Sequence, residues 1–200
     1  MLKPKVEMSI FQTILARRSV RKFKAREVTS DTVRTLLEAA VCAPSAIHQE
    51  PWGFVVIQDK NLLRQLSDLA KPLFLDDIQQ RAPHAGHKME FFSQPDFNIF
   101  YNSGTLILIC GASAAPFVEA DCWLAAENFM LSACALGLGT CVIGSALPAL
   151  NLTSVKHQLG VPDDFTVVAP IILGYPDDAI APVLRKKPYI LANISAAANV

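Results

Sequence analysis

The sequence predicts a single α+β domain, and three observations lead to that fold class. The chain has 200 residues, which is enough for one well-packed domain and short for two. Stretches with apolar residues at helical spacing are mixed with short apolar runs typical of strands. These elements follow one another without the regular strand and helix alternation that a doubly wound parallel sheet requires.

Two helices are expected before the first strand. Ser9 is suited to cap a helix over residues 10–17, in which apolar side chains recur on one face. A second helix begins at Ser30 or Thr29, either of which can act as its cap. It ends before Pro44, because proline disfavours helical backbone angles in the residue that precedes it.

The middle of the chain changes from regular to irregular. Residues 52–57 are an apolar run typical of a buried strand, and residues 61–70 have the pattern of a third helix. Residues 71–98 are polar, contain histidines and are interrupted by prolines and a glycine, so they show no sustained period. We expect this stretch to be a variable, lid-like segment of the domain.

The second half returns to regular elements. Strands are expected over residues 104–110, 140–143 and 165–173, and a short helix over residues 153–159. Residues 119–136 predict a long helix whose apolar positions cover most of its circumference. Such a helix is expected to be buried on several sides.

Composition limits the classes of function. Eighteen basic and eighteen acidic residues cancel, so no overall field attracts nucleic acid or an anionic membrane. Hydrophobic residues make up 52% of the chain, which a buried subunit interface would explain. No secretory signal is evident, and a cytoplasmic location is expected. No metal site is expected, and the five cysteines are interpreted as reduced core thiols: Cys42, Cys110, Cys122, Cys134 and Cys141.

The most distinctive cluster is Arg17, Arg18, Ser19 and Arg21. It places three guanidinium groups and a hydroxyl within five residues of an otherwise neutral protein. Arginine forks suit phosphate or the polar edge of a cofactor, because several fixed donors can meet acceptor oxygens together. The alternative is a solvated basic helix end that complements the helix dipole.

Three further stretches are candidates for ligand contacts. The loop at residues 43–52 combines small residues with two prolines, which allows the backbone to approach a planar ligand, although an ordinary stiff loop is an equal alternative. The glycine-rich stretch at residues 137–144 lacks the context of a Rossmann or Walker loop. The basic cluster at residues 185–188 is either a second anion contact or a solvated tail.

Taken in order, these motifs resemble those of the nitroreductase family of flavoproteins. The resemblance runs from about Phe11 to Pro188, except for residues 71–98. It consists of the Arg-Arg-Ser-x-Arg cluster, the Ala-Pro-Ser-Ala loop that leads to Pro-Trp, the helix that runs into Gly-Leu-Gly-Thr-Cys, and the closing basic cluster.

The resemblance implies an intertwined homodimer with a mainly antiparallel central sheet flanked by helices, and two FMN sites between the subunits. Arg17, Arg18 and Ser19 would lie along the FMN phosphate and pyrimidine side, and Arg21 would approach N1 and O2 of the isoalloxazine. The second subunit would cover the flavin through Pro44, Ser45 and Ala46, with His48 from the same loop. The backbone of Ile143 and Gly144 would face N5, and Arg185, with Lys187, would hold the phosphate.

The implied activity is ping-pong hydride transfer from NADH or NADPH to a nitroaromatic, quinone or similar acceptor. No side-chain acid, base or nucleophile is needed, because the flavin carries the chemistry and Arg21 tunes it. Alternatives are a specialised relative, such as an azoline oxidase, a dehalogenase or a flavin-fragmenting enzyme, and a non-catalytic flavin-binding module. The chain departs from the family pattern at His48 and Glu50, where Asn and Gln are usual.

Overall fold

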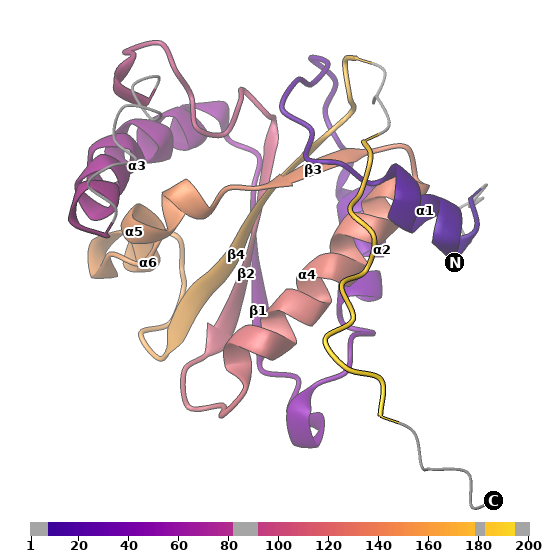
Figure 1. The fold of residues 1–200 in the computed structure, drawn as a ribbon. Helices are drawn as coiled ribbons and strands as arrows, with labels where there is room; N and C mark the ends of the chain where they lie inside the picture. The colour runs from indigo at the N-terminus through magenta and orange to yellow at the C-terminus, as the bar shows by residue number, and fades with distance from the viewer. Residues whose placement is uncertain (1–7, 82–91, 179–182, 195–200) are drawn as a thin grey trace, which may run out of the picture.

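A four-stranded antiparallel sheet forms the centre of the molecule (Figure 1). The computed structural model describes residues 8–81, 92–178 and 183–194. The strand order is β1-β2-β4-β3. The strands are β1 (Trp52–Ile57), β2 (Thr105–Ala112), β3 (Gly139–Val142) and β4 (Phe165–Gly174). The expected α+β class with an antiparallel sheet is therefore confirmed.

Helices cover both faces of this sheet (Figure 1). One face carries α1 (Ile10–Ala16), α2 (Ser30–Ala40) and α4 (Val118–Ala135), and the other carries α3 (Lys60–Arg81), α5 (Leu147–Leu150) and α6 (Thr153–Gln158). Two short 3-10 turns, η1 (Ala46–His48) and η3 (Gly144–Ala146), complete the elements that concern the site. None of the helices in the described part of the chain is long and apolar enough to cross a bilayer.

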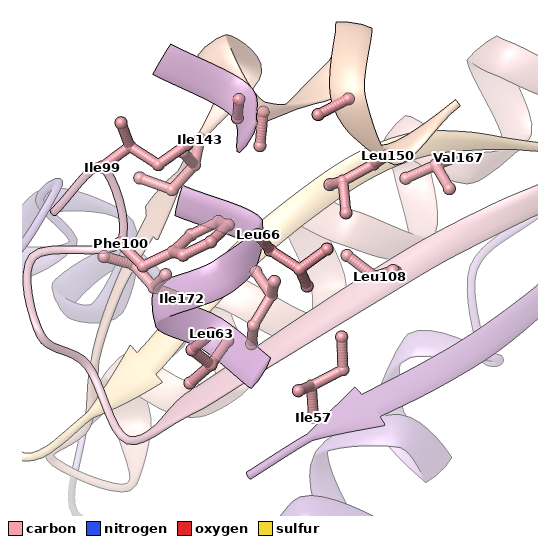
Figure 2. Packing of buried hydrophobic residues seen from close by; sticks show 14 of the residues in the cluster. Ile57, Leu63, Leu66, Ile99, Phe100, Leu108, Ile143, Leu150, Val167 and Ile172 are labelled. Carbon is pink, nitrogen blue, oxygen red and sulfur yellow. The ribbon is translucent and has the colours of Figure 1, made fainter. Parts of the chain in front are cut away.

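The two faces of the sheet give two hydrophobic cores. Successive residues of a strand point to opposite faces, so Leu106 and Leu108 of β2 join the core under α3, while Ile107 and Ile109 join the core under α4. Figure 2 shows the first core, where Leu63 and Leu66 of α3 lie among sheet residues. Since β2 and β4 are the central strands and helices cover both of their faces, their side chains are almost completely buried.

The expected helix starts are present in the structure. Ser9 forms a capping box at α1: its hydroxyl accepts from the Gln12 backbone N, and the Gln12 side chain accepts from the Ser9 backbone N. Of the two candidates at α2, Thr29 is the cap, and its hydroxyl accepts from the backbone N of Thr32. These bonds satisfy helix amides that would otherwise lack partners.

Two details of the expected elements are wrong. The strand at residues 52–57 is not buried along its length, because β1 is an edge strand and only Ile57 is buried. The third helix does not end at Ala70 but continues through Pro72 to Arg81, so the expected lid-like stretch begins as a helix. Residues 82–91 of that stretch lie outside the described residues.

Helix α4 and two cysteines also differ from expectation. Within one chain α4 is buried on the side facing the sheet, while Trp123 and Leu124 are exposed.

All five cysteines are free. Cys42 is exposed and Cys134 is half-buried, so these two are not core thiols. Both cysteines have apolar neighbours in the sequence, Val41 and Ala43 beside Cys42 and Ala133 and Ala135 beside Cys134, so nothing local to them indicated exposure.

Candidate active site

An extended segment that follows α1, residues 17–24, lies along the β3 edge of the sheet. Ser19 and Thr140 form a parallel bridge, and the backbone N of Val20 donates to the carbonyl oxygen of Thr140 at 2.9 Å. Val20 is buried. In extended backbone, alternate side chains share a direction, so Ser19 and Arg21 lie on the side opposite Val20.

Two glycines make this close approach possible. A Cβ on Gly139 would lie 2.7 Å from Cβ of Val20, and a Cβ on Gly174 would lie 2.7 Å from Cδ1 of Phe23. Both distances are shorter than real Cβ contacts allow. Because Gly139 of β3 and Gly174 of β4 have no side chains, the segment can lie directly against the sheet. The two glycines therefore determine how close Ser19 and Arg21 come to the sheet edge.

The first two arginines of the cluster are partly engaged inside the chain. Arg17 pairs with Glu127 of α4, with 3.3 Å between Nε and Oε1. Arg18 donates from Nη1 to the carbonyl oxygens of Leu15 and Arg17, each at 2.7 Å. This contact caps the end of α1, as the dipole alternative foresees. Its Nε, however, is buried and has no acceptor among the described residues.

Ser19 and Arg21 meet the end of β3. Burial raises the pKa of the Cys141 thiol, and the charge of Arg21 together with hydrogen bonds from Ser19 and Arg21 acts in the opposite direction. The guanidinium carbon of Arg21 also lies 5.7 Å from the ring centroid of Tyr101. Arg21 is therefore bordered by an aromatic ring and a buried thiol.

The turn after β3 opens onto a pocket. The backbone N of Ile143 donates to the carbonyl oxygen of Pro170 at 2.8 Å, which fixes the turn, and Ile143 is buried. A Cβ on Gly144 would meet nothing within 4 Å, so the space beside this residue is open. The pocket beside Gly144 is lined by an apolar group and an ion pair: Phe74, Leu147 and Pro148, with Asp77 and Arg81.

The structure therefore brings four of the expected residues together. Because the 17–24 segment runs parallel to β3, Ser19 and Arg21 advance along the same direction as the strand that ends before Ile143 and Gly144. The 17–24 segment and the turn after β3 thus both lie along the β3 edge of the sheet (Figure 1).

The expected flavin-covering loop lies elsewhere in the chain. The backbone N of Ala46 donates to both carboxylate oxygens of Asp121, at 3.1 and 3.2 Å. By contrast, α1 contacts the far part of α4, where the Cys134 thiol donates to the carbonyl oxygen of Thr13. Thirteen helical residues separate the two contacts, or about 20 Å at 1.5 Å per residue. Within one chain, Pro44, Ser45, Ala46 and His48 are thus remote from Arg21.

This loop has an unusual backbone. Ile47, His48 and Glu50 have φ angles of 46°, 59° and 46°, in the left-handed region that non-glycine residues rarely adopt. The Ser45 hydroxyl accepts from the backbone N of Glu50 at 3.0 Å and closes the loop. Ile47 is 82% exposed at its tip. Such strain persists only where the surroundings fix it, and the Asp121 contact is one such restraint.

The C-terminal basic cluster is extended and exposed. Arg185 and Lys187 have no hydrogen bond or ion pair with any described residue, and Figure 1 shows their segment without helix or strand. The structure does not bring them to Arg21 within one chain. The connection at residues 179–182 lies outside the described residues.

Two residues of the site region were missed by sequence reasoning. Tyr101 lies between the irregular stretch and β2, where no helical or strand period marks it. Asp121 lies within the predicted helix over residues 119–136 and was assigned no role, although a carboxylate in such an apolar run is itself a signal. It is only 3% exposed, and buried carboxylates require hydrogen-bond donors.

The arrangement suits a ligand with acceptor oxygens and a planar part. Ser19 and Arg21 present donors, the buried Arg18 Nε lacks an acceptor, and the space beside Gly144 is open. Arginine donors match phosphate or carbonyl oxygens, and the apolar side chains beside Gly144 match a ring system. The residues present therefore fit a phosphorylated planar cofactor such as FMN.

Comparison with known proteins agrees with this fit. A model of the nitroreductase family matches residues 14–175. A relative from Archaeoglobus fulgidus, named "Putative NADH dehydrogenase/NAD(P)H nitroreductase", is 28% identical over 166 residues, which are 82% of this chain and 84% of the relative. An iodotyrosine deiodinase from Thermotoga neapolitana is 24% identical over 165 residues, or 81% and 86% of the two chains. A solved nitroreductase with bound FMN from Bacteroides fragilis has a TM-score of 0.74 and 27% identity, covering 94% of this chain and 98% of its own.

Proposed function

Because the chain belongs to the nitroreductase family, we propose that it is an FMN-dependent oxidoreductase that takes electrons from NADH or NADPH and passes them to a small-molecule acceptor. Nitroaromatics and quinones are the proposed acceptors. The observation that carries the proposal is the position of Arg21 and Ser19 beside the end of β3, next to the open space at Gly144. The names of the A. fulgidus relative and of the FMN-bound structure support it.

The proposed cofactor contacts are of two kinds, basic or hydroxyl side chains at the polar parts of FMN and backbone at its ring. Arg17, Arg18 and Ser19 would lie along the phosphate and pyrimidine side of FMN, and Arg18 Nε has no acceptor among the described residues. Arg185 and Lys187 would bind the phosphate, and their exposed, unpaired state in one chain leaves them able to do so. The backbone of Ile143 and Gly144 would border the N5 side, where no side chain of Gly144 intervenes.

Each group of residues has a distinct task in the proposed reaction. When bound, FMN supplies the hydride acceptance from the nicotinamide and the later transfer to the acceptor, as two half-reactions. Arg21 holds a positive charge near the ring edge where reduction adds negative charge, and so favours the reduced state. The apolar side chains of Phe74, Leu147 and Pro148 offer a dry surface to an aromatic substrate.

A homodimer is part of the proposal, because one chain does not complete the site. The loop with Pro44, Ser45, Ala46 and His48 is remote from Arg21 of the same chain, so a second copy would supply it. Large exposed apolar side chains support such an interface. They occur on α1, on α4 and in the tail: Ile10, Phe11, Ile14, Leu15, Trp123, Leu124, Leu184, Tyr189 and Leu191.

A cytoplasmic location is likewise proposed. The five cysteines are all free in the structure, which agrees with a reducing compartment.

One experiment tests the main proposal. The purified protein, reconstituted with FMN, is titrated anaerobically with NADH and separately with NADPH while the flavin absorbance is followed. Acceptors are then added one at a time: a nitroaromatic, a quinone, free FMN and an iodinated phenol. Bleaching by a nicotinamide and recovery with a nitroaromatic or quinone is the expected result.

The outcomes of this experiment separate the alternatives. A colourless protein that does not bind added FMN would contradict the proposal. Bound flavin without reduction by either nicotinamide would favour a flavin-binding module. Turnover confined to the iodinated phenol would favour a dehalogenase, the class to which the T. neapolitana relative's name points.

A further inference from the structure

We propose that Tyr101 is a positioning residue for Arg21, and that through Arg21 it sets the reduction potential of the bound flavin. The inference rests on the proposed function, since it requires FMN to bind beside Arg21. Nothing in the family motifs of the sequence involves Tyr101, which precedes β2 in an irregular stretch.

The contact between the two side chains is a cation–π interaction. The guanidinium carbon of Arg21 lies 5.7 Å from the centroid of the Tyr101 ring, and such contacts are effective within about 6 Å. Arg21 is otherwise an exposed residue and pairs with no carboxylate among the described residues. A long side chain in this setting has many rotamers, so the Tyr101 ring, together with the contact to Cys141, is what restricts the guanidinium.

Tyr101 is itself held in place by its backbone and by packing. Tyr101 and Asn102 both have φ of 53°, in the left-handed region, and the backbone N of Tyr101 donates to the carbonyl oxygen of Asn98 at 2.8 Å. The Tyr101 ring meets Phe97 edge to face at 5.7 Å, and Phe97 meets Phe92 at 5.3 Å. Backbone strain in a non-glycine residue persists where surrounding contacts fix it. The ring is thus a fixed surface against which Arg21 can rest.

A fixed cation affects the flavin differently from a mobile one. Reduction adds negative charge to the pyrimidine side of the flavin, and a preorganised charge stabilises it without reorganising first. A guanidinium that is free to turn toward water loses part of this effect. Removal of the ring should therefore weaken the binding of reduced FMN more than the binding of oxidised FMN.

The test compares Tyr101→Leu with Tyr101→Phe, which keeps the aromatic face. The measured quantities are the dissociation constant of oxidised FMN and the reduction potential of the loaded protein. In Tyr101→Leu the affinity for reduced FMN should fall up to about fivefold relative to oxidised FMN, the factor that an exposed cation–π contact corresponds to. For a two-electron couple at 29.6 mV per tenfold, this is a potential lower by roughly 20 mV. Tyr101→Phe should keep the parent potential.

The chain offers a matched control in a second pair of the same kind. Arg26 lies over the Tyr175 ring, with 4.0 Å from its guanidinium carbon to the centroid, and neither residue has a proposed role at the flavin. Tyr175→Leu should therefore leave the potential unchanged. A shift of similar size in this variant would mean that loss of any nearby ring disturbs the site.

A double-mutant cycle decides whether Tyr101 acts through Arg21. In an Arg21→Ala background, Tyr101→Leu should cause no further change in potential. An equal shift in both backgrounds, or no shift in the parent, overturns the proposal. If Tyr101→Leu does not fold, Tyr101→Met fills the same space without an aromatic face and takes its place. A protein that binds no FMN contradicts the proposed function, whereas a flavin-loaded variant with the parent potential contradicts only the role of Tyr101.

Discussion

A methyl group added at Gly139 should displace the segment that carries Ser19 and Arg21. The new Cβ would lie 2.7 Å from Cβ of Val20 and 2.7 and 2.8 Å from its two methyl carbons, so no rotamer of Val20 relieves the contact. Ordinary contact begins at 3.4 Å, which requires the segment to retreat by about 0.7 Å. The 2.9 Å bond from Val20 to Thr140 would then lengthen to about 3.6 Å, beyond hydrogen-bond range.

The expected cost follows from these two effects. Overpacking costs about 1–3 kcal/mol, and loss of one backbone hydrogen bond adds roughly 0.5–1.5 kcal/mol. Gly139→Ala should therefore lower the free energy of unfolding by about 1.5–4.5 kcal/mol in a urea titration of the apoprotein. It should also lower the FMN content of the purified protein, because Ser19 and Arg21 move with the segment.

Gly104→Ala is the matched control, since a Cβ there meets nothing within 4 Å. It should change the free energy of unfolding by no more than about 0.5 kcal/mol, as exposed substitutions do. In a Val20→Gly background, the cost of Gly139→Ala should largely disappear, because the clashing atoms are gone. If Gly139→Ala is as mild as the Gly104 variant, then the 17–24 segment does not depend on this contact and the reasoning fails.

Three more predictions concern the flavin and the thiols. Arg21→Ala should lower the potential of bound FMN more than it weakens FMN binding, and an unchanged potential in a spectroelectrochemical titration would remove its assigned role. Arg185→Ala should do the reverse and weaken FMN binding by about 1.5–3 kcal/mol, the range for a hydrogen bond to a charged group; full FMN retention after dialysis would place the phosphate elsewhere. At pH 8 a thiol reagent should modify the exposed Cys42 of the native apoprotein. Burial raises the pKa of the Cys110 thiol to about 12, so Cys110 should react only after unfolding. Peptide mapping that finds Cys110 labelled in the native protein would contradict its burial.

Local signals in the sequence were sufficient for most elements. The Ser9 and Thr29 caps and the apolar period that follows each one depend on neighbours within a few residues, and the structure contains both. The end of α3 was beyond such reasoning. Proline costs a helix about 3 kcal/mol, but α3 continues past Pro72 because Leu73 and Phe74 pack on the same core as Leu63.

The site was predictable only where motif order could replace geometry. More than 100 residues separate the pair Ser19 and Arg21 from the turn at Ile143 and Gly144. The two segments come together through the bridge from Ser19 to Thr140, which no local sequence pattern specifies. Tyr101 shows the limit more clearly, since its importance comes from a ring contact with a residue 80 positions away. Contacts of that kind depend on how the irregular stretch before β2 folds back on the sheet.

The loop tip at Ile47 has a consequence for assembly. Left-handed backbone in a non-glycine residue costs about 1–3 kcal/mol. The hydrogen bonds from the Ala46 backbone N to Asp121 help to offset this strain when the chain folds. A flexible loop would instead lose roughly 1–2 kcal/mol of backbone entropy for each residue that becomes ordered on binding. The protein thus presents Ile47 as a preformed protrusion, and whatever surface receives it gains a contact without having to order the loop.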